Sequence, residues 1–475
     1  MDEAIAEAVE GGIEGYREAL FDLLERPSVS TTGEGMDAAA DAVVSTLSRF
    51  GFDAVRRIET DRYPLVYAER TVDEDPSDKA DGEGRSDGAD DESGGRPTIL
   101  FYGHYDVQPP GDVAEWETPP FEPTVRDGRI YARGVGDNKG QFLAHAFALD
   151  ALDRAGLETE VDVKLLVEGG EESGSAGLRE YLAGEPPELA DADLLYVADG
   201  PMHAVAEGEG RRDLPTIAYG NRGVLSFQLD VRTARTDLHS GNFGGPVPAA
   251  SNVLVDALAS LREGDDVLVD GFYDGAEVAD ADRELARAIP AEERELRERL
   301  GVEEFAGDRP YYERLLLEPT MTINGLESGY RGDGMKTVLP ATATAKLDCR
   351  LVPGQDPDAV FERIRDHLGS VDGRVEVTKQ GTFPSAKTPV DAPAARSVRE
   401  ALSAVWGTEP VELPVLGGSL PAAYFRRVPA LADVPLLVVP YANHDQGNHS
   451  PNENLSLDCF RNGIATSAEV VRRFR

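Results

Sequence analysis

The sequence predicts an α/β protein in which a mostly parallel sheet flanked by helices is interrupted by an inserted α+β domain. Two observations predict this fold. Between residues 98 and 199, apolar runs of strand length alternate with helical patterns, as in the repeating units of a parallel sheet. From residue 214 the pattern changes to strands and helices in two βαβ-like halves, which is typical of a ferredoxin-like antiparallel sheet.

The chain length supports a division into two domains. A chain of 475 residues exceeds what one ordinary core encloses. The α/β character also returns after Pro384. We therefore expect one domain made of residues 1–213 and 385–475, and a second made of residues 214–384.

The first predicted elements are two helices followed by two strands. Residues 5–24 carry apolar side chains at helical spacing, and these are Ile5, Val9, Ile13, Tyr16, Leu20 and Leu24. A second helix is predicted at 36–50, and strands are predicted at 64–68 and 98–102. The segment 72–95 between those strands is rich in Asp, Glu, Gly and Ser, so we expect a disordered surface insertion without a function of its own.

Strands and helices continue to alternate along the rest of the chain. In the first domain we expect a helix at 141–155, a strand at 161–167, a short helix at 178–182 and a strand at 194–198. In the second domain the predicted elements are strands at 216–219 and 224–233, helices at 249–261 and 281–300, strands at 320–323 and 342–351, a helix at 358–368 and a strand at 375–379.

The chain is strongly acidic, with 47 basic against 88 acidic residues and a net charge of −41. The segment 72–95 holds ten acidic and two basic residues, a net of −8, which leaves −33 on the remainder. Because the excess is spread evenly, it indicates a surface adapted to a salt-rich cytoplasm, where a Debye length of ~3 Å at 1 M salt screens self-repulsion. The alternative is an acidic protein from a cell with an ordinary salt concentration. Nucleic acid and anionic membranes are poor partners for such a surface.

Composition also indicates a cytoplasmic location. No apolar run approaches the ~20 residues that span a bilayer. The N-terminus is acidic and lacks the basic and apolar regions of a signal peptide. Two cysteines, Cys349 and Cys459, are too few for a disulfide framework and fit a reducing compartment.

Residues that bind metals or move protons follow three of the predicted strands. His104 and Asp106 follow the strand at 98–102, Glu171 and Glu172 follow the strand at 161–167, and Asp199 follows the strand at 194–198. In an open α/β sheet, ligands bind outside the carboxyl ends of the strands. The series, completed by Asp137 and the distant His449, therefore predicts one shared metal site.

The number of ligand-type residues predicts two metal ions. His104, Asp137, Glu172, Asp199 and His449 exceed what a single catalytic zinc uses. Asp137 lies among glycines, and one carboxylate can bridge two cations, so each ion would receive three protein ligands. Such pairs lie ~3.5–4 Å apart and suit hydrolysis. Because Glu171 and Glu172 are adjacent and their side chains diverge, we expect one ligand and one general base.

Each residue also has an ordinary explanation. A single histidine in a loop is usually exposed, and paired glutamates are usually solvated surface, so only the ordered series after strands carries the prediction. Three other histidines lack such context and are interpreted as structural, namely His145, His203 and His367. His444 lies close to His449 but has no motif of its own.

Four motifs resemble the co-catalytic zinc metallopeptidases, a group that includes carnosine dipeptidases, aminoacylase and succinyl-diaminopimelate desuccinylase. They are the segments 103–110 (GHYDVQPP), 134–140 (GVGDNKG), 168–175 (EGGEESGS) and 448–452 (NHSPN). The resemblance covers almost the whole chain apart from the acidic insertion. The segments around His239 and Lys336 are most similar to the carnosinase-type dipeptidases, and the charge suggests a halophilic archaeal source.

The resemblance implies a role for each residue of the series. Asp137 would bridge the two metals, with His104 and Asp199 on one and Glu172 and His449 on the other. Glu171 would be the general base, which works best with a pKa raised towards neutrality. Asp106 would sit behind His104 and hold its ring. The Asp137–Asn138 peptide bond would be cis.

Further residues implied by the resemblance lie in or near the inserted domain, which would act as lid and dimerisation domain. His239 would stabilise the oxyanion from the partner subunit, which implies an obligate homodimer. Arg350 would bind the substrate carboxylate in a bidentate pair, helped by Thr337 and by Gly418 and Ser419.

Three functions follow from this pattern. The first is a two-metal dipeptidase that cleaves peptides with a free carboxylate, using zinc, manganese or cobalt. The second is an N-acyl-amino-acid deacylase with the same site, since the chemistry at the carbonyl is shared. The third is a metal-binding scaffold without catalysis, against which Glu171 argues because a scaffold needs no base. The expected partners are a small peptide or N-acyl amino acid and a second copy of the chain.

Overall fold

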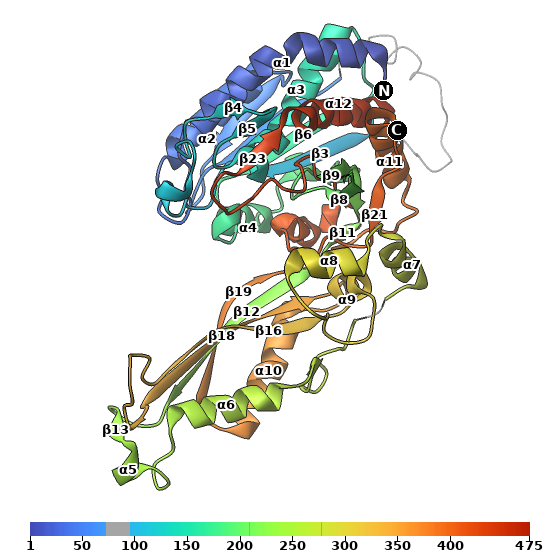
Figure 1. The fold of residues 1–475 in the computed structure, drawn as a ribbon. Coiled ribbons are helices and arrows are strands. Elements are labelled where there is room, and N and C mark those ends of the chain that lie inside the picture. Colours follow the sequence, from blue (N-terminus) through green and yellow to red (C-terminus); the bar gives the residue numbers. More distant parts are fainter. Residues whose placement is uncertain (73–95, 209, 277) are drawn as a thin grey trace. The chain divides into compact units, whose positions relative to one another are not determined.

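The chain forms two compact units in this computed structural model, which describes residues 1–72, 96–208, 210–276 and 278–475. The first unit comprises Met1–Tyr219, Thr388–Glu412 and Tyr424–Arg475, and the second comprises Gly220–Lys387 and Leu413–Ala423. The two ends of the chain therefore belong to one unit, as the colours of Figure 1 show. The division falls after Tyr219, and the short segment Leu413–Ala423 belongs to the second unit. Beyond Val72, the predicted insertion 72–95 lies outside the described residues.

An eight-stranded sheet forms the centre of the first unit. Its order is β1 (Ala54–Ile58), β2 (Leu65–Arg70), β6 (Asp162–Glu168), β3 (Thr98–His104), β7 (Leu194–Val197), β22 (Leu436–Val438), β10 (Thr216–Ala218) and β21 (Val411–Leu413). The four central strands, from β6 to β22, pair in parallel, whereas β1, β2 and β10 pair antiparallel to their neighbours. Every residue of β3 is buried, as expected of a strand covered on both faces.

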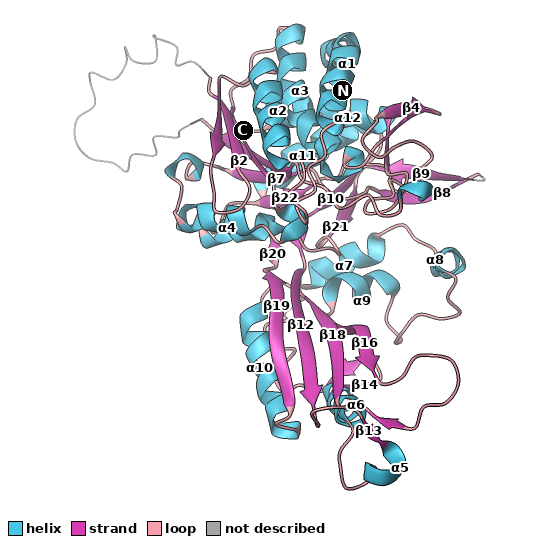
Figure 2. Ribbon diagram, turned by 90° about the vertical axis from the view of Figure 1, so that its left-hand side faces the viewer, coloured by secondary structure: helices cyan, strands magenta, loops and turns pink. Residues whose placement is uncertain are grey.

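Helices cover this sheet. They are α1 (Glu3–Leu24), α2 (Met36–Arg49), α3 (Gly140–Ala155), α4 (Ala176–Ala183), α11 (Pro393–Trp406) and α12 (Leu457–Arg473). Figure 2 shows α1, α2, α3 and α12 gathered on one side of the sheet, with α4 on the other. Side-chain caps begin two of them: Asp2 accepts a hydrogen bond from the Ala4 N–H, and Ser456 accepts one from the Cys459 N–H.

Shorter elements complete the first unit. Three strands form a small sheet in the order β23 (Asn454–Ser456), β5 (Arg129–Tyr131) and β4 (Thr124–Arg126), and a hairpin joins β8 (His203–Glu207) to β9 (Gly210–Leu214). Single turns of helix lie at Val113–Glu115, Val135–Lys139, Glu171–Ser173, Pro187–Leu189 and Pro429–Leu431, and a longer one at Pro421–Arg427 enters this unit from the second.

The second unit has the predicted ferredoxin-like topology. Its main elements in chain order are β12 (Gly223–Arg232), α6 (Ala250–Leu261), β16 (Thr320–Ser328), β18 (Thr342–Leu351), α10 (Pro357–Val371) and β19 (Val375–Phe383). The antiparallel sheet has the order β16-β18-β12-β19. Alternate residues of β12 and β18 are buried in one core with α6 and α10, so the two helices cover the same face.

The remaining elements of the second unit are short. They are β11 (Gly220–Asn221), β13 (Leu238–His239), α5 (Ser240–Phe243), β14 (Arg262–Glu263), β15 (Asp266–Val267), α7 (Asp280–Ala288), α8 (Glu293–Leu300), α9 (Tyr311–Leu317), β17 (Val338–Leu339) and β20 (Ala386–Lys387). The helix predicted at 281–300 is wrong in one respect, because it is divided into α7 and α8. Pro290 lies at the break, where it lacks the N–H that a continuous helix needs.

The predicted fold class is confirmed in both units. Strands and helices occupy the expected segments, and their ends differ from the predicted ones by a few residues. In the part of the chain that the structure describes, no helix combines the length and the apolar character needed to cross a bilayer.

His145 in α3 should remain neutral in the folded protein. Its ring stacks on Phe101 with 4.0 Å between centroids, and burial lowers the pKa of His145 to about 3. The unfolded chain takes up this proton near pH 6.5 and the folded chain does not. As the pH falls from about 6.5 to about 3, this histidine therefore lowers the free energy of unfolding by up to about 1.4 kcal/mol for each pH unit.

NMR titration of the imidazole nitrogens checks this expectation, and a His145 midpoint between pH 6 and 7 would contradict it. A His145→Phe variant provides the control, because its free energy of unfolding should lose this part of the dependence on pH.

Candidate metal centre

Two groups of potential ligands lie close together in the first unit. One group is His104, Asp137 and Asp199, and the other is Asp137, Glu172 and His449. Within each group the ligand atoms lie within 4.8 Å of one another. The five residues predicted as ligands from the sequence are thus brought together, and Asp137 belongs to both groups.

The carboxylate of Asp137 faces one group with each oxygen. Oδ1 lies 3.1 Å from Nε2 of His104, and Oδ2 lies 3.2 Å from Nε2 of His449. Asp199 Oδ2 lies 3.7 Å from the same nitrogen of His104, and Glu172 Oε1 lies 3.2 Å from that of His449. This arrangement suits a carboxylate that bridges two cations.

The ends of the central strands position these side chains. His104 is the last residue of β3, and Asp199 follows β7 by two residues. Glu171 and Glu172 lie in the turn Glu171–Ser173 after β6. Asp137 lies in the turn that precedes α3, and its peptide bond to Asn138 is cis. The parallel strands end at one edge of the sheet, which is why residues far apart in sequence meet there.

Asp106 connects two of these strand ends. Its Oδ1 accepts a hydrogen bond from the Glu171 N–H at 3.1 Å, and its Oδ2 accepts one from the Glu172 N–H at 3.0 Å. Oδ1 also lies 3.4 Å from Nδ1 of His104, on the ring edge opposite Asp137. Asp106 therefore orients His104 and also holds the backbone that carries both glutamates.

Glu453 lies behind the candidate site and is not predicted by any pattern in the sequence. Its buried carboxylate accepts hydrogen bonds from the N–H groups of Gly134, Gly136 and Asp137 at 2.9–3.0 Å, and Arg133 donates another at 2.7 Å. Burial raises the pKa of Glu453, and the Arg133 charge opposes that shift. Its position four residues after His449 carries no recognised spacing, so sequence offered no signal for it.

Two amides also contact the ligand carboxylates. Asn448 Nδ2 donates to Asp137 Oδ2 at 3.3 Å, and Gln108 Nε2 donates to Glu172 Oε2 at 2.9 Å. Both belong to motif segments quoted above, 103–110 and 448–452, although an amide side chain alone gave no reason to assign them a role. His444 has a separate partner, since its Nδ1 lies 2.7 Å from Asp213 Oδ1.

The buried and closely spaced carboxylates of the site favour the binding of positive charge. Burial raises the pKa of Asp199, and the nearby Asp137 raises it further. Burial likewise raises the pKa of Glu171 well above its usual range. The neighbouring His104 opposes that shift, whereas Glu172, Asp199 and Asp137 add to it. Hydrogen bonds to Asp137 and Glu172 raise the pKa of His449 to about 10.

The donors fit divalent cations. Imidazole nitrogens and carboxylate oxygens are ligands of zinc and of similar ions. Glu172 Oε1 is buried and lies 3.2 Å from Nε2 of His449, a nitrogen that carries no proton when it binds a cation. A buried carboxylate oxygen without a hydrogen-bond donor is stabilised when it binds a cation.

The predicted substrate-binding residues lie in the second unit. Arg350 in β18 donates through Nη1 to Ser419 Oγ at 3.3 Å and through Nε to Asp348 at 3.1 Å. His239 in β13 lies 3.4 Å from Thr337 Oγ1 through Nε2. Gly418 precedes Ser419 in the segment Leu413–Ala423 of the same unit.

Replacing Glu453 by glutamine should weaken both the fold and the metal centre. The change leaves Arg133 without its charge partner, and breaking a buried pair costs about 3–5 kcal/mol of the free energy of unfolding. Loss of a group that orients ligands typically lowers metal affinity 10–100-fold. Chelator competition and denaturant unfolding measure the two effects.

Glu469→Gln is the matched control. Glu469 is a buried glutamate paired with Arg472 and Arg473 in α12, so its loss should reduce stability without changing metal affinity. Unchanged metal affinity in the Glu453 variant would limit Glu453 to a role in the fold.

Comparison with known proteins identifies the family. The family model of peptidase family M20/M25/M40 matches residues 100–473. The Cys-Gly metallodipeptidase of Schizosaccharomyces pombe is 29% identical over 381 residues, which are 78% of each chain. The human Beta-Ala-His dipeptidase is 30% identical over 373 residues, which are 76% of this chain and 71% of that protein.

Two solved structures resemble the whole chain. An M20 family metallo-carboxypeptidase from Sulfolobus solfataricus has a TM-score of 0.84 and 32% identity and covers 100% of this chain and 99% of its own. Human carnosine dipeptidase 1 has a TM-score of 0.76 and 25% identity, with 99% of each chain covered. The resemblance inferred from the motifs is confirmed, and the chain belongs to the M20/M25/M40 family of peptidases.

Proposed function

We propose that this protein is a two-metal dipeptidase that cleaves dipeptides, or short peptides, with a free carboxylate. The observation that carries the proposal is the pair of ligand groups that share Asp137, with Glu171 beside them. Two relatives that cover more than two thirds of the chain are named as dipeptidases, for Cys-Gly and for Beta-Ala-His.

The ligand groups support two divalent ions per chain. We propose zinc, and the same donors also accept manganese or cobalt. When bound, such a pair acidifies water and polarises the carbonyl oxygen of the substrate. His104 and Asp199 would hold one ion, Glu172 and His449 would hold the other, and Asp137 would bridge them.

Glu171 is proposed as the general base. It accepts a proton from the attacking water and delivers that proton to the leaving amine. A raised pKa supports both transfers, because a base with a pKa near the working pH can also act as the acid. The hydrogen bond from the Glu171 N–H to Asp106 fixes the backbone from which this carboxylate extends.

Residues of the second unit are proposed to bind the rest of the substrate. Nε and Nη1 of Arg350 are engaged by Asp348 and Ser419, and in the described residues no hydrogen bond engages Nη2. Nη2 and the Ser419 hydroxyl then suit a carboxylate, with Gly418 contributing a nearby contact. Thr337 lies beside His239, before the start of β18, whereas Arg350 lies near the end of that strand, so we propose that Thr337 acts together with His239. We further propose that His239 stabilises the oxyanion and acts from the partner subunit of a homodimer.

Two other enzyme functions compete with this proposal. The Sulfolobus relative is named as a carboxypeptidase, which favours removal of a C-terminal residue from longer peptides. An N-acyl-amino-acid deacylase would use the same groups, because an amide carbonyl is attacked in each reaction. We also propose that the enzyme acts in a salt-rich cytoplasm, in keeping with the net charge of −41.

Glu171→Gln should abolish most of the turnover. Glutamine cannot accept the proton, and loss of general base catalysis lowers kcat by about 10²–10⁴-fold. The metal content measured by elemental analysis should stay at the wild-type level. Glu160→Gln, which alters an exposed glutamate in a loop, provides the matched control. Wild-type kcat in the Glu171 variant would refute its role as the base.

A panel of three substrates separates the competing functions. We expect the dipeptide Ala-Leu to be hydrolysed with a higher kcat/KM than N-acetyl-leucine or the pentapeptide Ala-Ala-Ala-Ala-Leu. All three end in the same free carboxylate, so the comparison isolates what precedes the cleaved bond. Release of leucine is measured at matched concentration in high salt. A preference for N-acetyl-leucine favours the deacylase, and a preference for the pentapeptide favours the carboxypeptidase.

A further inference from the structure

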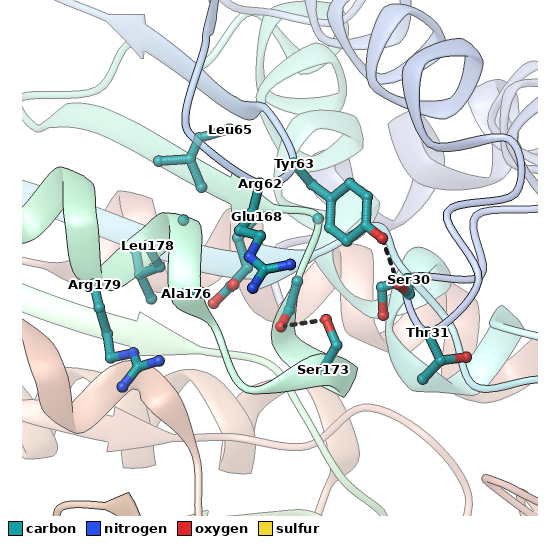
Figure 3. A pocket seen from close by; sticks show the side chains of 13 residues that line it. Ser30, Thr31, Arg62, Tyr63, Leu65, Glu168, Ser173, Ala176, Leu178 and Arg179 are labelled. Carbon is teal, nitrogen blue, oxygen red and sulfur yellow. Dashed lines mark hydrogen bonds between the residues drawn. The ribbon is translucent and has the colours of Figure 1, made fainter. Parts of the chain in front are cut away.

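A pocket separate from the ligand groups lies in the first unit beside the turn that carries Glu171 and Glu172. Its volume is about 360 Å³, which lies within the usual range of small-molecule sites. It is lined by the loop after α1, the segment before β2, the end of β6 and the start of α4 (Figure 3). It includes none of the five residues of the metal centre.

The pocket contains a buried carboxylate oxygen that can accept a further hydrogen bond. Glu168 is 1% exposed, and its Oε1 accepts a hydrogen bond from the Tyr102 hydroxyl at 2.6 Å. Oε2 has no donor within hydrogen-bond distance among the described residues, although the buried Ser175 hydroxyl lies close enough to lower the pKa of Glu168. A Cβ placed on Gly170 would lie 3.7 Å from Oε2 and 3.8 Å from Ser173 Oγ, so the missing side chain of this glycine leaves space beside the carboxylate. A ligand that donates a hydrogen bond fits there.

Two arginines line the same pocket. In the described parts of the chain, neither Arg62 nor Arg179 forms an ion pair with a carboxylate, and the Arg179 guanidinium lies 5.7 Å from the Tyr424 ring centroid. Acidic residues outnumber basic ones by 88 to 47, so guanidinium groups without carboxylate partners are unexpected here. Both are exposed, which leaves them accessible to an anionic group from solution.

The combined charges select the ligand. The buried Glu168 carboxyl calls for a hydrogen-bond donor and offers nothing to a simple anion, and a simple cation would be repelled by Arg62 and Arg179. A zwitterion satisfies both ends, with an ammonium group at Glu168 and a carboxylate in charge-assisted hydrogen bonds to the arginines. Leu65 and Leu178 add apolar surface to the wall. We propose that this pocket binds a free α-amino acid with an aliphatic side chain.

The position of the pocket links a bound ligand to regulation of the proposed hydrolysis. Gly169 and Gly170 line it and lead directly into Glu171, so an occupied pocket would restrain the turn that carries the proposed base. Products of the proposed hydrolysis belong to this class of ligand. Only the regulatory meaning rests on the proposed function, because binding depends on the pocket residues alone.

Equilibrium dialysis of radiolabelled leucine with the full-length, metal-loaded protein tests the proposal. In the Arg62→Gln/Arg179→Gln double variant, the affinity of this pocket for leucine should fall at least tenfold. Dialysis should then detect one bound leucine per chain fewer than in the wild type. Arg49→Gln is the matched control, because Arg49 also lies over an aromatic ring, that of Phe50, without an ion pair among the described residues. It should bind leucine as the wild type does.

Two analogues test each end of the ligand separately. Leucinamide lacks the carboxylate, and 2-hydroxy-4-methylpentanoate lacks the ammonium group, so each should compete with leucine at this site at least tenfold more weakly. Gly170→Ala gives a second variant, because its methyl group meets its neighbours at ordinary contact distance and occupies ligand space. It too should lower leucine affinity.

Unchanged leucine stoichiometry and affinity in both variants would overturn the proposal, as would a hydroxy acid that binds as tightly as leucine. These outcomes are distinct from a failure of the proposed function. A protein that binds leucine in this pocket but hydrolyses no peptide would retain the site and lose the enzyme assignment.

Discussion

The candidate metal centre stands on a loop that one buried carboxylate, Glu453, holds in place. Glu453 accepts three backbone hydrogen bonds from the segment Gly134–Asp137 and one from Arg133, and this fixes the loop on which Asp137 stands. Because Asp137 belongs to both ligand groups, a shift of its backbone would disturb both at once. Replacing a buried carboxylate that accepts several hydrogen bonds costs much stability, because all of its donors lose their acceptor at the same time.

Asp106 performs the corresponding task on the other side of the site. It ties the end of β3 to the turn after β6 through the N–H groups of Glu171 and Glu172. In both arrangements a carboxylate holds a segment of backbone, and that backbone positions the side chains of the proposed ligands. A site built this way on strand ends is more exact than one built on free loops, because the sheet determines the spacing.

The sequence predicted residues whose roles follow local rules. His104, Glu172 and Asp199 are predicted as ligands because an apolar strand precedes each, and the structure brings these side chains to the two ligand groups. The ferredoxin-like topology follows from the order of strands and helices. Pro290 lies within a run of strong helix formers, and the pattern of that run predicts one helix where two exist. Glu453 could not be found, because its partners Arg133, Gly134 and Gly136 lie more than 300 positions earlier in the chain. Contacts of that range leave no periodic trace in a single sequence.

The division of the first unit along the chain has a consequence for biosynthesis. His104, Asp137 and Asp199 are made before the second unit, whereas His449 and Glu453 are made after it. A nascent chain therefore displays a cluster of carboxylates long before their last imidazole partner exists. Non-local closure of this kind is slow. The candidate centre is therefore completed only after the whole of the second unit has been synthesised, as the last ligand follows that unit in the chain.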